Sequence, residues 1–277
     1  MSRPAWTTSN SGGTSLPPGI DTSVGHPARV WDYWLGGKDH FPADREVGDQ
    51  ILAAMPQLSV MARADREFLG RAVRHLVQEA GISQFLDIGT GIPTANNTHQ
   101  VAQAIAPEVR VVYVDNDPIV LSHARALLTS SPEGATDYVD ADLREPGKIL
   151  DAAAATLDLA KPVAIMLLGI LEFIPDDDQA SQVIGHLLDA VPAGSYLAIA
   201  HSTNEVQRKA MDEAARRWNE SGATPLTLRD RAALTRLFEG LELLEPGVVA
   251  CPLWRPDEST SYAGEEVPQF CGVGRKP

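Results

Sequence analysis

From Gln84 onward, short apolar runs alternate with longer stretches that have the periodicity of helices. This alternation constrains the fold more than any other feature, because it is typical of a parallel, doubly wound α/β sheet. The first predicted strands are Gln84–Ile88, Arg110–Val114, Thr136–Val139, Val163–Leu168 and Ser195–Ala200. The predicted helices among and after them are Thr94–Ile105, Pro118–Leu128, Pro146–Leu157, Asp177–Val191 and Glu205–Glu220. Two further strands, Glu242–Ala250 and Gln269–Val273, follow a helix near Arg229–Phe238, and we expect them to pair antiparallel at one edge.

The part of the chain before this sheet has helical patterns only. A helix is predicted over Val30–Leu35 and ends at Gly36, and two more helices are separated near Pro56. The last of them carries an apolar stripe and ends at Gly81. Residues 1–25 are rich in Ser, Thr, Gly and Pro and are predicted to form a mobile tail. The predicted organisation is a tail (1–25), a helical segment (26–81) and a sheet domain (82–277).

Composition excludes several classes of partner. The formal net charge is -14, from 23 Lys and Arg against 37 Asp and Glu, so nucleic acid and anionic membranes are poor partners. The two cysteines, Cys251 and Cys271, have no His cluster at a metal-ligand spacing, so neither a disulfide framework nor a metal site is predicted. No apolar run approaches the roughly 20 residues of a membrane span. We therefore expect a soluble, cytoplasmic protein, and the sequence does not indicate its oligomeric state.

The turn after the first predicted strand reads Asp87-Ile88-Gly89-Thr90-Gly91-Ile92-Pro93-Thr94. In open parallel sheets, ligands bind at the carboxyl ends of the strands, so this turn is a candidate binding site. Gly89 can adopt a conformation closed to other residues, and Gly91 lets a ligand approach the main chain. A dinucleotide fold would have a third glycine where Thr94 stands, and Asp87 would repel a pyrophosphate. The turn favours a zwitterionic or cationic nucleoside over NAD.

Acidic residues follow the next two strands. Asp115 ends the second strand, where a carboxylate can accept hydrogen bonds from both hydroxyls of a ribose, and Asn116 follows it. Asp117 precedes Pro118 and is predicted to cap a helix. After the third strand, Asp142 can accept a hydrogen bond from an adenine amine with Leu143 against the ring, although Asp142 can equally be a turn residue.

These residues resemble those of class I S-adenosylmethionine-dependent methyltransferases. The segments PARVWDYWLGGKDHFPADRE, FLDIGTGIPTANNTHQVAQ, VVYVDNDPIVLSHARALL and CGVGRKP resemble, more narrowly, a bacterial family of methyltransferases of unassigned substrate. The resemblance implies a Rossmann-like, mostly parallel seven-stranded sheet with a reversed last strand, and an N-terminal helical cap over the cofactor cleft. It also implies a set of cofactor-binding residues: Asp87 near the amino group, Gly89 and Gly91 under the methionine part, Asp115 at the ribose and Asp142 at the adenine amine. Thr90, Asn116 and Leu143 belong to the same predicted set.

The acceptor side is less defined, because in-line methyl transfer needs a base only if the acceptor must lose a proton. Candidate catalytic residues are His201 after the fifth strand, Glu172 after the fourth and Tyr33 in the aromatic segment Trp31–His40. Each has a structural alternative: a polar strand end, a loop carboxylate, or an aromatic anchor of the cap in place of a lid. His99 is predicted to be a surface or packed residue.

The sequence therefore predicts a methyltransferase that uses S-adenosylmethionine and acts on a small-molecule acceptor. Two alternatives stay open. One is a regulatory protein that binds S-adenosylmethionine or S-adenosylhomocysteine without turnover, since no catalytic base stands out. The other is an NAD(P)-dependent oxidoreductase, which Thr94 and Asp87 disfavour.

Overall fold

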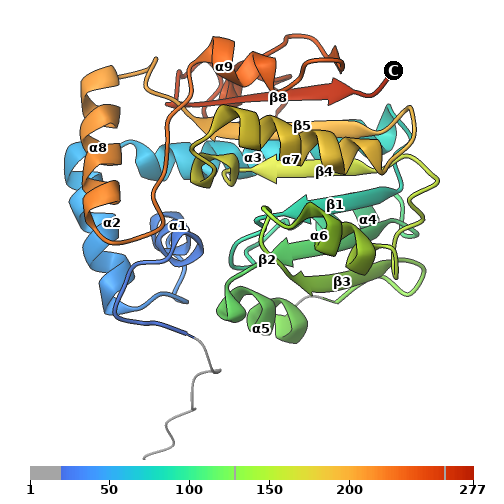
Figure 1. Cartoon of the computed structure of the whole chain (residues 1–277), viewed down its shortest axis with the longest axis horizontal. Helices are drawn as coiled ribbons and strands as arrows, with labels where there is room; N and C mark the ends of the chain where they lie inside the picture. The colour runs from blue at the N-terminus through green and yellow to red at the C-terminus, as the bar shows by residue number, and fades with distance from the viewer. Residues whose placement is uncertain (1–19, 128, 259) are drawn as a thin grey trace, which may run out of the picture.

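The computed structural model describes residues 20–127, 129–258 and 260–277. At its centre lies a sheet of eight strands in the order β3-β2-β1-β4-β5-β8-β6, with β7 paired to β8 (Figure 1). The strands are β1 (Gln84–Ile88), β2 (Arg110–Asp115), β3 (Ala135–Asp140), β4 (Ala164–Leu168), β5 (Tyr196–Ser202), β6 (Glu242–Leu243), β7 (Val249–Ala250) and β8 (Gln269–Arg275). Strands β1 to β5 are parallel, and β8 is antiparallel to β5. The predicted mostly parallel α/β sheet with a reversed last strand is confirmed.

The sheet differs from the prediction at its edge, where one expected strand, Glu242–Ala250, is two short strands. Both pair antiparallel with β8. The interruption contains Pro246, which has no N–H to donate to a ladder, and Gly247, which has a left-handed φ of 86°. The N–H of Gly247 closes a turn on the carbonyl of Leu244 at 2.8 Å. The chain therefore leaves the ladder for a turn and returns to it.

Helices cover both faces of the sheet (Figure 1). One hydrophobic cluster joins residues of α6, α7 and α9 to one face of the strands, including Leu86 and Ile88 of β1. A second joins α3 and α4 to the other face, including Phe85. Since side chains alternate along a strand, neighbours in β1 serve opposite layers. The helices are α1 (Pro27–Leu35), α2 (Pro42–Ala54), α3 (Leu58–Gln78), α4 (Thr98–Gln103), α5 (Pro118–Leu127), α6 (Pro146–Ala153), α7 (Asp177–Asp189), α8 (Arg208–Glu220) and α9 (Arg231–Arg236), with 3-10 turns η1 (Leu171–Phe173) and η2 (Cys251–Leu253).

Helix α4 begins four residues later than the predicted start at Thr94. Asn96 has a φ of 60°, a left-handed conformation that a helix cannot contain. The next residue, Asn97, forms the N-cap, and its N–H donates to Gln100 Oε1 at 2.9 Å. The extended turn that results lengthens the rim after β1.

The first two helices lie with α8 at the end of the sheet toward which β1 to β4 point (Figure 1). Helix α2 packs against both α1 and α8, whereas α3 packs against α4 and the sheet. Residues 1–19 of the predicted tail lie outside the described residues. Within the rest of it, the carbonyl of Asp21 accepts two hydrogen bonds from Arg29 at 3.1 Å. That 26–81 and 82–277 are separate units stays a prediction.

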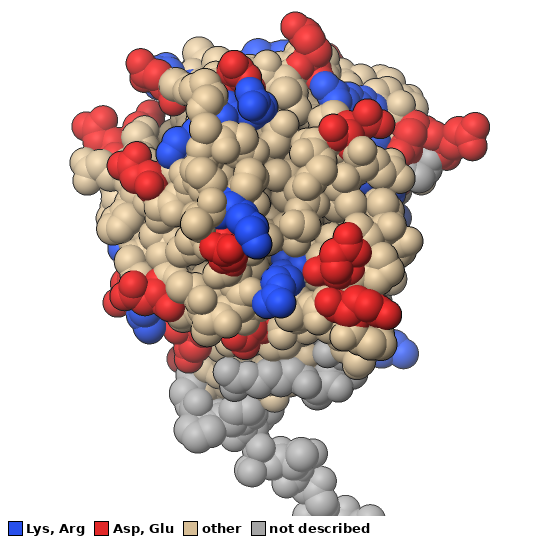
Figure 2. Space-filling model, turned by 90° about the vertical axis from the view of Figure 1, so that its right-hand side faces the viewer, with Lys and Arg blue, Asp and Glu red and all other residues tan. Residues whose placement is uncertain are grey.

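The surface mixes charges of both signs. On the face shown in Figure 2, Lys and Arg side chains lie scattered among Asp and Glu. No helix within the described ranges is long and apolar enough to cross a membrane. Cys251 and Cys271 are both buried and not joined in a disulfide.

Candidate functional site

A cavity lies at the carboxyl ends of the parallel strands, between the sheet and helices α1, α3 and α8. Topology dictates this position, because parallel neighbouring strands bring the turns that follow them to one edge. All eight predicted cofactor residues line this cavity, namely Asp87, Gly89, Thr90, Gly91, Asp115, Asn116, Asp142 and Leu143. The structure therefore brings together residues from three separate strand ends.

The glycine turn is tightly built. Gly89 has a φ of 75°, and a Cβ added there would lie 2.7 Å from Cβ of Ile170, so a larger residue cannot fit without movement. Gly91 has a φ of 64°, but a Cβ there would have nothing within 4 Å. Its N–H donates to Oδ2 of Asp115 at 3.0 Å. The turn is therefore joined to the end of β2 by the acid predicted to bind the ribose.

Two buried carboxylates lie beneath the turn. Asp87 accepts a hydrogen bond from the Thr98 hydroxyl at 2.6 Å, and burial raises its pKa to about 6. Burial likewise raises the pKa of Asp115, although the N–H groups of Asp117 and Gly91 oppose the shift. Since burial disfavours the charged form, both groups gain from a ligand that is cationic or donates hydrogen bonds.

The third strand end is more exposed. Oδ2 of Asp142 accepts from the Asn116 amide at 3.3 Å and from Arg144 at 3.1 Å. Its Oδ1 accepts from the N–H of Arg144 at 2.8 Å. Leu143 is buried against the cavity. Asp140, two residues before Asp142, is an exposed strand end.

Of the three catalytic candidates, Glu172 lines the cavity. It is buried in η1, and its Oε1 accepts from the N–H and the hydroxyl of Ser202 at 3.0 and 3.1 Å. Its Oε2 is buried without a hydrogen-bond partner among the described residues. Such an atom costs free energy unless a ligand satisfies it.

His201 and Tyr33 are not among the residues that line this cavity. His201 is buried, with its Nε2 2.8 Å from Arg229 Nη1 and its Nδ1 2.8 Å from the carbonyl of Ser202. Burial lowers the pKa of His201, which keeps the ring neutral between these partners. The Tyr33 hydroxyl bonds to Asp49 Oδ1 at 2.5 Å. His99 is packed, with its ring nitrogen 2.8 Å from the Tyr113 hydroxyl.

Asp65, which is not among the residues predicted from the sequence, lines the cavity from α3. This side chain is 5% exposed, and its Oδ1 has no hydrogen-bond partner in the described part of the chain. Burial raises the pKa of Asp65 to about 7; the neighbouring Glu172 and Asp87 carboxylates add to the shift, and Arg66 and the side chain of Gln269 oppose it. The signal was present in the sequence, since Asp65 interrupts the apolar stripe of its helix at a position four residues from Met61 and Leu69.

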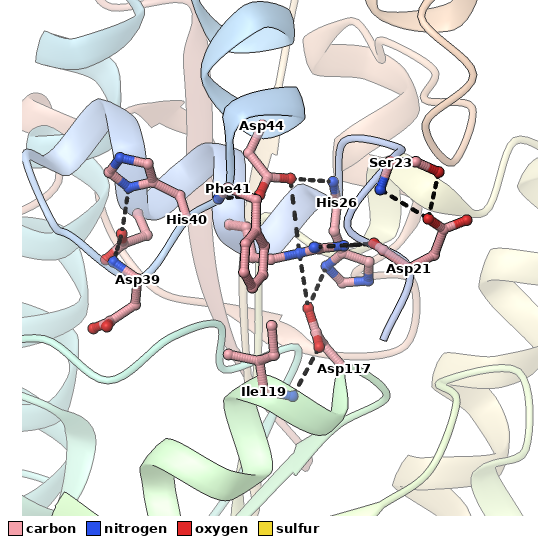
Figure 3. Close-up of polar contacts among 11 residues, drawn as sticks. Asp21, Ser23, His26, Asp39, His40, Phe41, Asp44, Asp117 and Ile119 are labelled. Atoms are coloured by element: carbon pink, nitrogen blue, oxygen red, sulfur yellow. Dashed lines mark hydrogen bonds and ion pairs between the residues drawn. The ribbon is translucent and has the colours of Figure 1, made fainter. Parts of the chain in front are cut away.

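Helix α1 is held to the sheet edge by a cluster that we call the N-terminal anchor: His26, Arg29, Asp44 and Asp117. Figure 3 shows His26, Asp44 and Asp117 pointing toward one another. Oδ2 of Asp117 lies 3.0 Å from His26 Nδ1 and 3.4 Å from Arg29 Nε. Asp44 accepts from the N–H groups of His26 at 2.9 Å and Phe41 at 2.7 Å. Oδ1 of Asp117 also accepts from Ile119 N–H at 2.9 Å, so its predicted capping of α5 is confirmed. Asp117 thus caps α5 with one carboxylate oxygen and forms ion pairs with the start of α1 through the other.

Comparison with known proteins adds an independent finding. Residues 13–277 match the family described as S-adenosyl methyltransferase. A DUF574 family protein from Streptomyces avermitilis has 48% identity and a TM-score of 0.89, over 93% of this chain and 99% of that one. A protein from Thermobifida fusca proposed to be a methyltransferase has 42% identity and a TM-score of 0.86, over 95% and 99%.

More distant structures share the fold alone. The plantazolicin methyltransferase BpumL, solved in complex with SAH, has 9% identity and a TM-score of 0.53, over 90% of this chain and 95% of that chain. No protein with a curated functional assignment has significant similarity to the chain.

Proposed function

The chain belongs to the S-adenosyl methyltransferase family, and from that premise we propose that it transfers a methyl group to a small molecule bound in the cavity at the strand ends. S-adenosylmethionine is the cofactor of the family, and it supplies a methyl group on a positively charged sulfonium. The observation that carries the proposal is that one cavity joins the glycine turn and its acids to an apolar wall of helical side chains.

The cofactor half of the cavity would consist of the strand ends. Gly89 and Gly91, both with a left-handed backbone, would lie at the methionine part, where the turn presents main chain and no side chain. Asp87 would accept from its amino group, and Asp115 from the ribose hydroxyls. The raised pKa values of both acids fit a ligand that brings positive charge and hydrogen-bond donors.

Asn116, Asp142 and Leu143 would contact the adenine end, and Thr90 completes the turn between the two glycines. A pyrophosphate, by contrast, would meet the carboxylate of Asp87 and no third glycine. These features support a sulfonium nucleoside over NAD(P).

The acceptor half would consist of helical side chains from α1, α3 and α8 together with η1. Trp34, Leu69, Met211 and Trp218 line the cavity and are buried. This apolar wall would contact the body of a small-molecule acceptor. Glu172 would contact the acceptor from η1, where Ser202 fixes its position.

Calorimetric titration with S-adenosylmethionine, S-adenosylhomocysteine and NAD in parallel tests the cofactor. We expect micromolar binding of the two sulfur nucleosides, about -8 kcal/mol, and no binding of NAD. Binding of NAD alone would refute the proposal in favour of an oxidoreductase.

Turnover separates an enzyme from a regulatory protein. The assay measures S-adenosylhomocysteine released in the presence of pooled small molecules, with Asp115→Asn as the variant impaired in cofactor binding. Release that depends on an acceptor and is reduced in Asp115→Asn supports catalysis. Tight binding with no release from any pool would favour the regulatory alternative.

A further inference from the structure

Two carboxylates at the acceptor half of the cavity have unsatisfied oxygens. Oδ1 of Asp65 and Oε2 of Glu172 are both buried and have no hydrogen-bond partner within the described ranges. Both residues line the cavity, with exposures of 5% and 3%. They are close enough for the charge of Glu172 to raise the pKa of Asp65. Each acid thus keeps one oxygen without a donor, and the two carboxylates repel each other, although Arg66 partly compensates the charge of Asp65. A bound cation with several N–H groups would relieve both costs.

In the described part of the chain, none of the other cavity carboxylates has a buried oxygen without a hydrogen-bond partner. Asp87 accepts from Thr98, Asp115 from Gly91, and Asp142 from Asn116. Asp32 accepts from the N–H of Asp39 at 2.9 Å. Asp65 and Glu172 therefore stand out by chemistry and by place, since they come from α3 and η1 and not from the turns that would hold the cofactor.

An aromatic wall belongs to the same half of the cavity. Its members are Trp31, Trp34, Trp218 and Phe173, with ring centroids 5.9 Å apart between the first two, 6.3 Å between Trp34 and Trp218, and 6.1 Å between Phe173 and Trp218. The indole N–H of Trp34 donates to the Gly48 carbonyl, and that of Trp218 to the Thr224 carbonyl. With these polar atoms occupied, the two rings offer apolar and π surface to a ligand, which also favours a cation.

We propose that the acceptor is an amine on a hydrophobic, preferably aromatic, body, and that Asp65 and Glu172 bind its ammonium group while the aromatic wall holds the body. The proposal rests on the proposed function and adds to it the class of acceptor. The methylated atom is then nitrogen.

Methyl transfer to this amine needs one proton acceptor, and Asp65 can serve as that acceptor. The ammonium gives a proton to the carboxylate of Asp65, and the freed nitrogen lone pair forms a bond to the methyl carbon. The bond between sulfur and that carbon breaks, and its electron pair stays on sulfur, which becomes a neutral thioether. The product is an N-methylated ammonium, still cationic, beside a protonated Asp65. A carboxylic acid with a pKa near neutrality suits this role, because it can take up the proton and release it again at physiological pH.

The test uses matched probes and the full chain saturated with S-adenosylhomocysteine. Phenethylamine and tryptamine are titrated calorimetrically against 2-phenylethanol and tryptophol, which carry a hydroxyl on the same skeletons. We expect the amines to bind at least about tenfold more tightly, because charge-assisted hydrogen bonds to two carboxylates are lost with the alcohols. Equal affinity for amine and alcohol, or no binding of either amine to protein that binds S-adenosylhomocysteine, would overturn the proposal.

Variants separate this result from the proposed function. Asp65→Asn and Glu172→Gln should each weaken amine binding about tenfold or more and leave the alcohols and S-adenosylhomocysteine nearly unchanged. Asp140→Asn, at an exposed strand end, removes the same charge and should change nothing. Retained amine affinity in both cavity variants would contradict the assignment of the ammonium site. Failure of wild-type protein to bind S-adenosylhomocysteine would instead contradict the proposed function.

Discussion

Replacing Asp65 with asparagine should stabilise the ligand-free protein, and the gain should depend on pH. Burial raises the pKa of this carboxyl from its ordinary 3.8 to about 7. Between those two values the folded protein keeps a proton that the unfolded chain has lost, so the free energy of unfolding falls as the pH rises. Asparagine has nearly the same shape and no charge to bury. At neutral and alkaline pH the wild-type protein buries an ionised carboxylate, which lowers its free energy of unfolding, and the variant does not.

The difference in free energy of unfolding between the variant and wild type follows from the raised pKa of Asp65. Three pKa units, at about 1.4 kcal/mol each, set a ceiling of about 4 kcal/mol above pH 7. Between pH 5 and pH 7 the difference between variant and wild type should grow by about 3 kcal/mol, since the cost rises by about 1.4 kcal/mol per pH unit. Asp87, whose pKa burial raises to about 6, adds a dependence of the same sign, but it is present in both proteins and largely cancels.

Urea unfolding followed by circular dichroism at pH 5, 6, 7 and 8 measures the difference. Asp140→Asn serves as the control, because an exposed substitution should stay within about 0.5 kcal/mol of wild type at each pH. A variant that is less stable than wild type at pH 8, or that differs from wild type equally at pH 5 and pH 8, would show that burying the Asp65 charge carries no such cost.

Three further outcomes are expected. In urea unfolding, Gly91→Ala should lower the free energy of unfolding by about 1–2 kcal/mol through its left-handed backbone alone, and Gly89→Ala should lower it further, because its Cβ would also collide with Ile170; equal losses would refute the steric argument. Asp115→Asn should weaken S-adenosylmethionine about 10- to 100-fold in calorimetry, and unchanged affinity would exclude the ribose role. Asp117→Asn, which weakens the N-terminal anchor, should lower the free energy of urea unfolding by about 1.5–3 kcal/mol, and no change would show that the ion pairs with α1 contribute nothing.

Strand positions and the gathering of three strand-end acids at one edge of the sheet could be predicted from the sequence for a topological reason. Apolar runs locate parallel strands, and parallel strands bring their following turns to one edge, so Asp87, Asp115 and Asp142 had to lie near each other. No knowledge of side-chain packing was needed. The same rule could not place Asp65, because its direction depends on how α3 rotates against the sheet.

Single-residue offsets explain why two catalytic candidates lie away from the cavity. Ser202 lines it and His201 does not, because neighbouring side chains in β5 point to opposite faces. In α1, Trp31 and Trp34 lie three residues apart on the face toward the cavity, while Tyr33 is directed to Asp49 of α2. A pattern that locates an element to within a residue does not decide which neighbour faces the site.

The two proposed halves of the cavity come from different elements, one from strand ends and the other from helices. Selectivity for the methyl donor is therefore separate from selectivity for the acceptor. Strand ends and their turns would define the methyl donor, while side chains on α1, α3, α8 and η1 would define the receiver. Exchanging a residue on the helical wall leaves the ladder hydrogen bonds and the glycine turn intact. Relatives can therefore diverge in the compounds they modify while sharing one donor, and a designer who wishes to redirect the reaction can work on the helices alone.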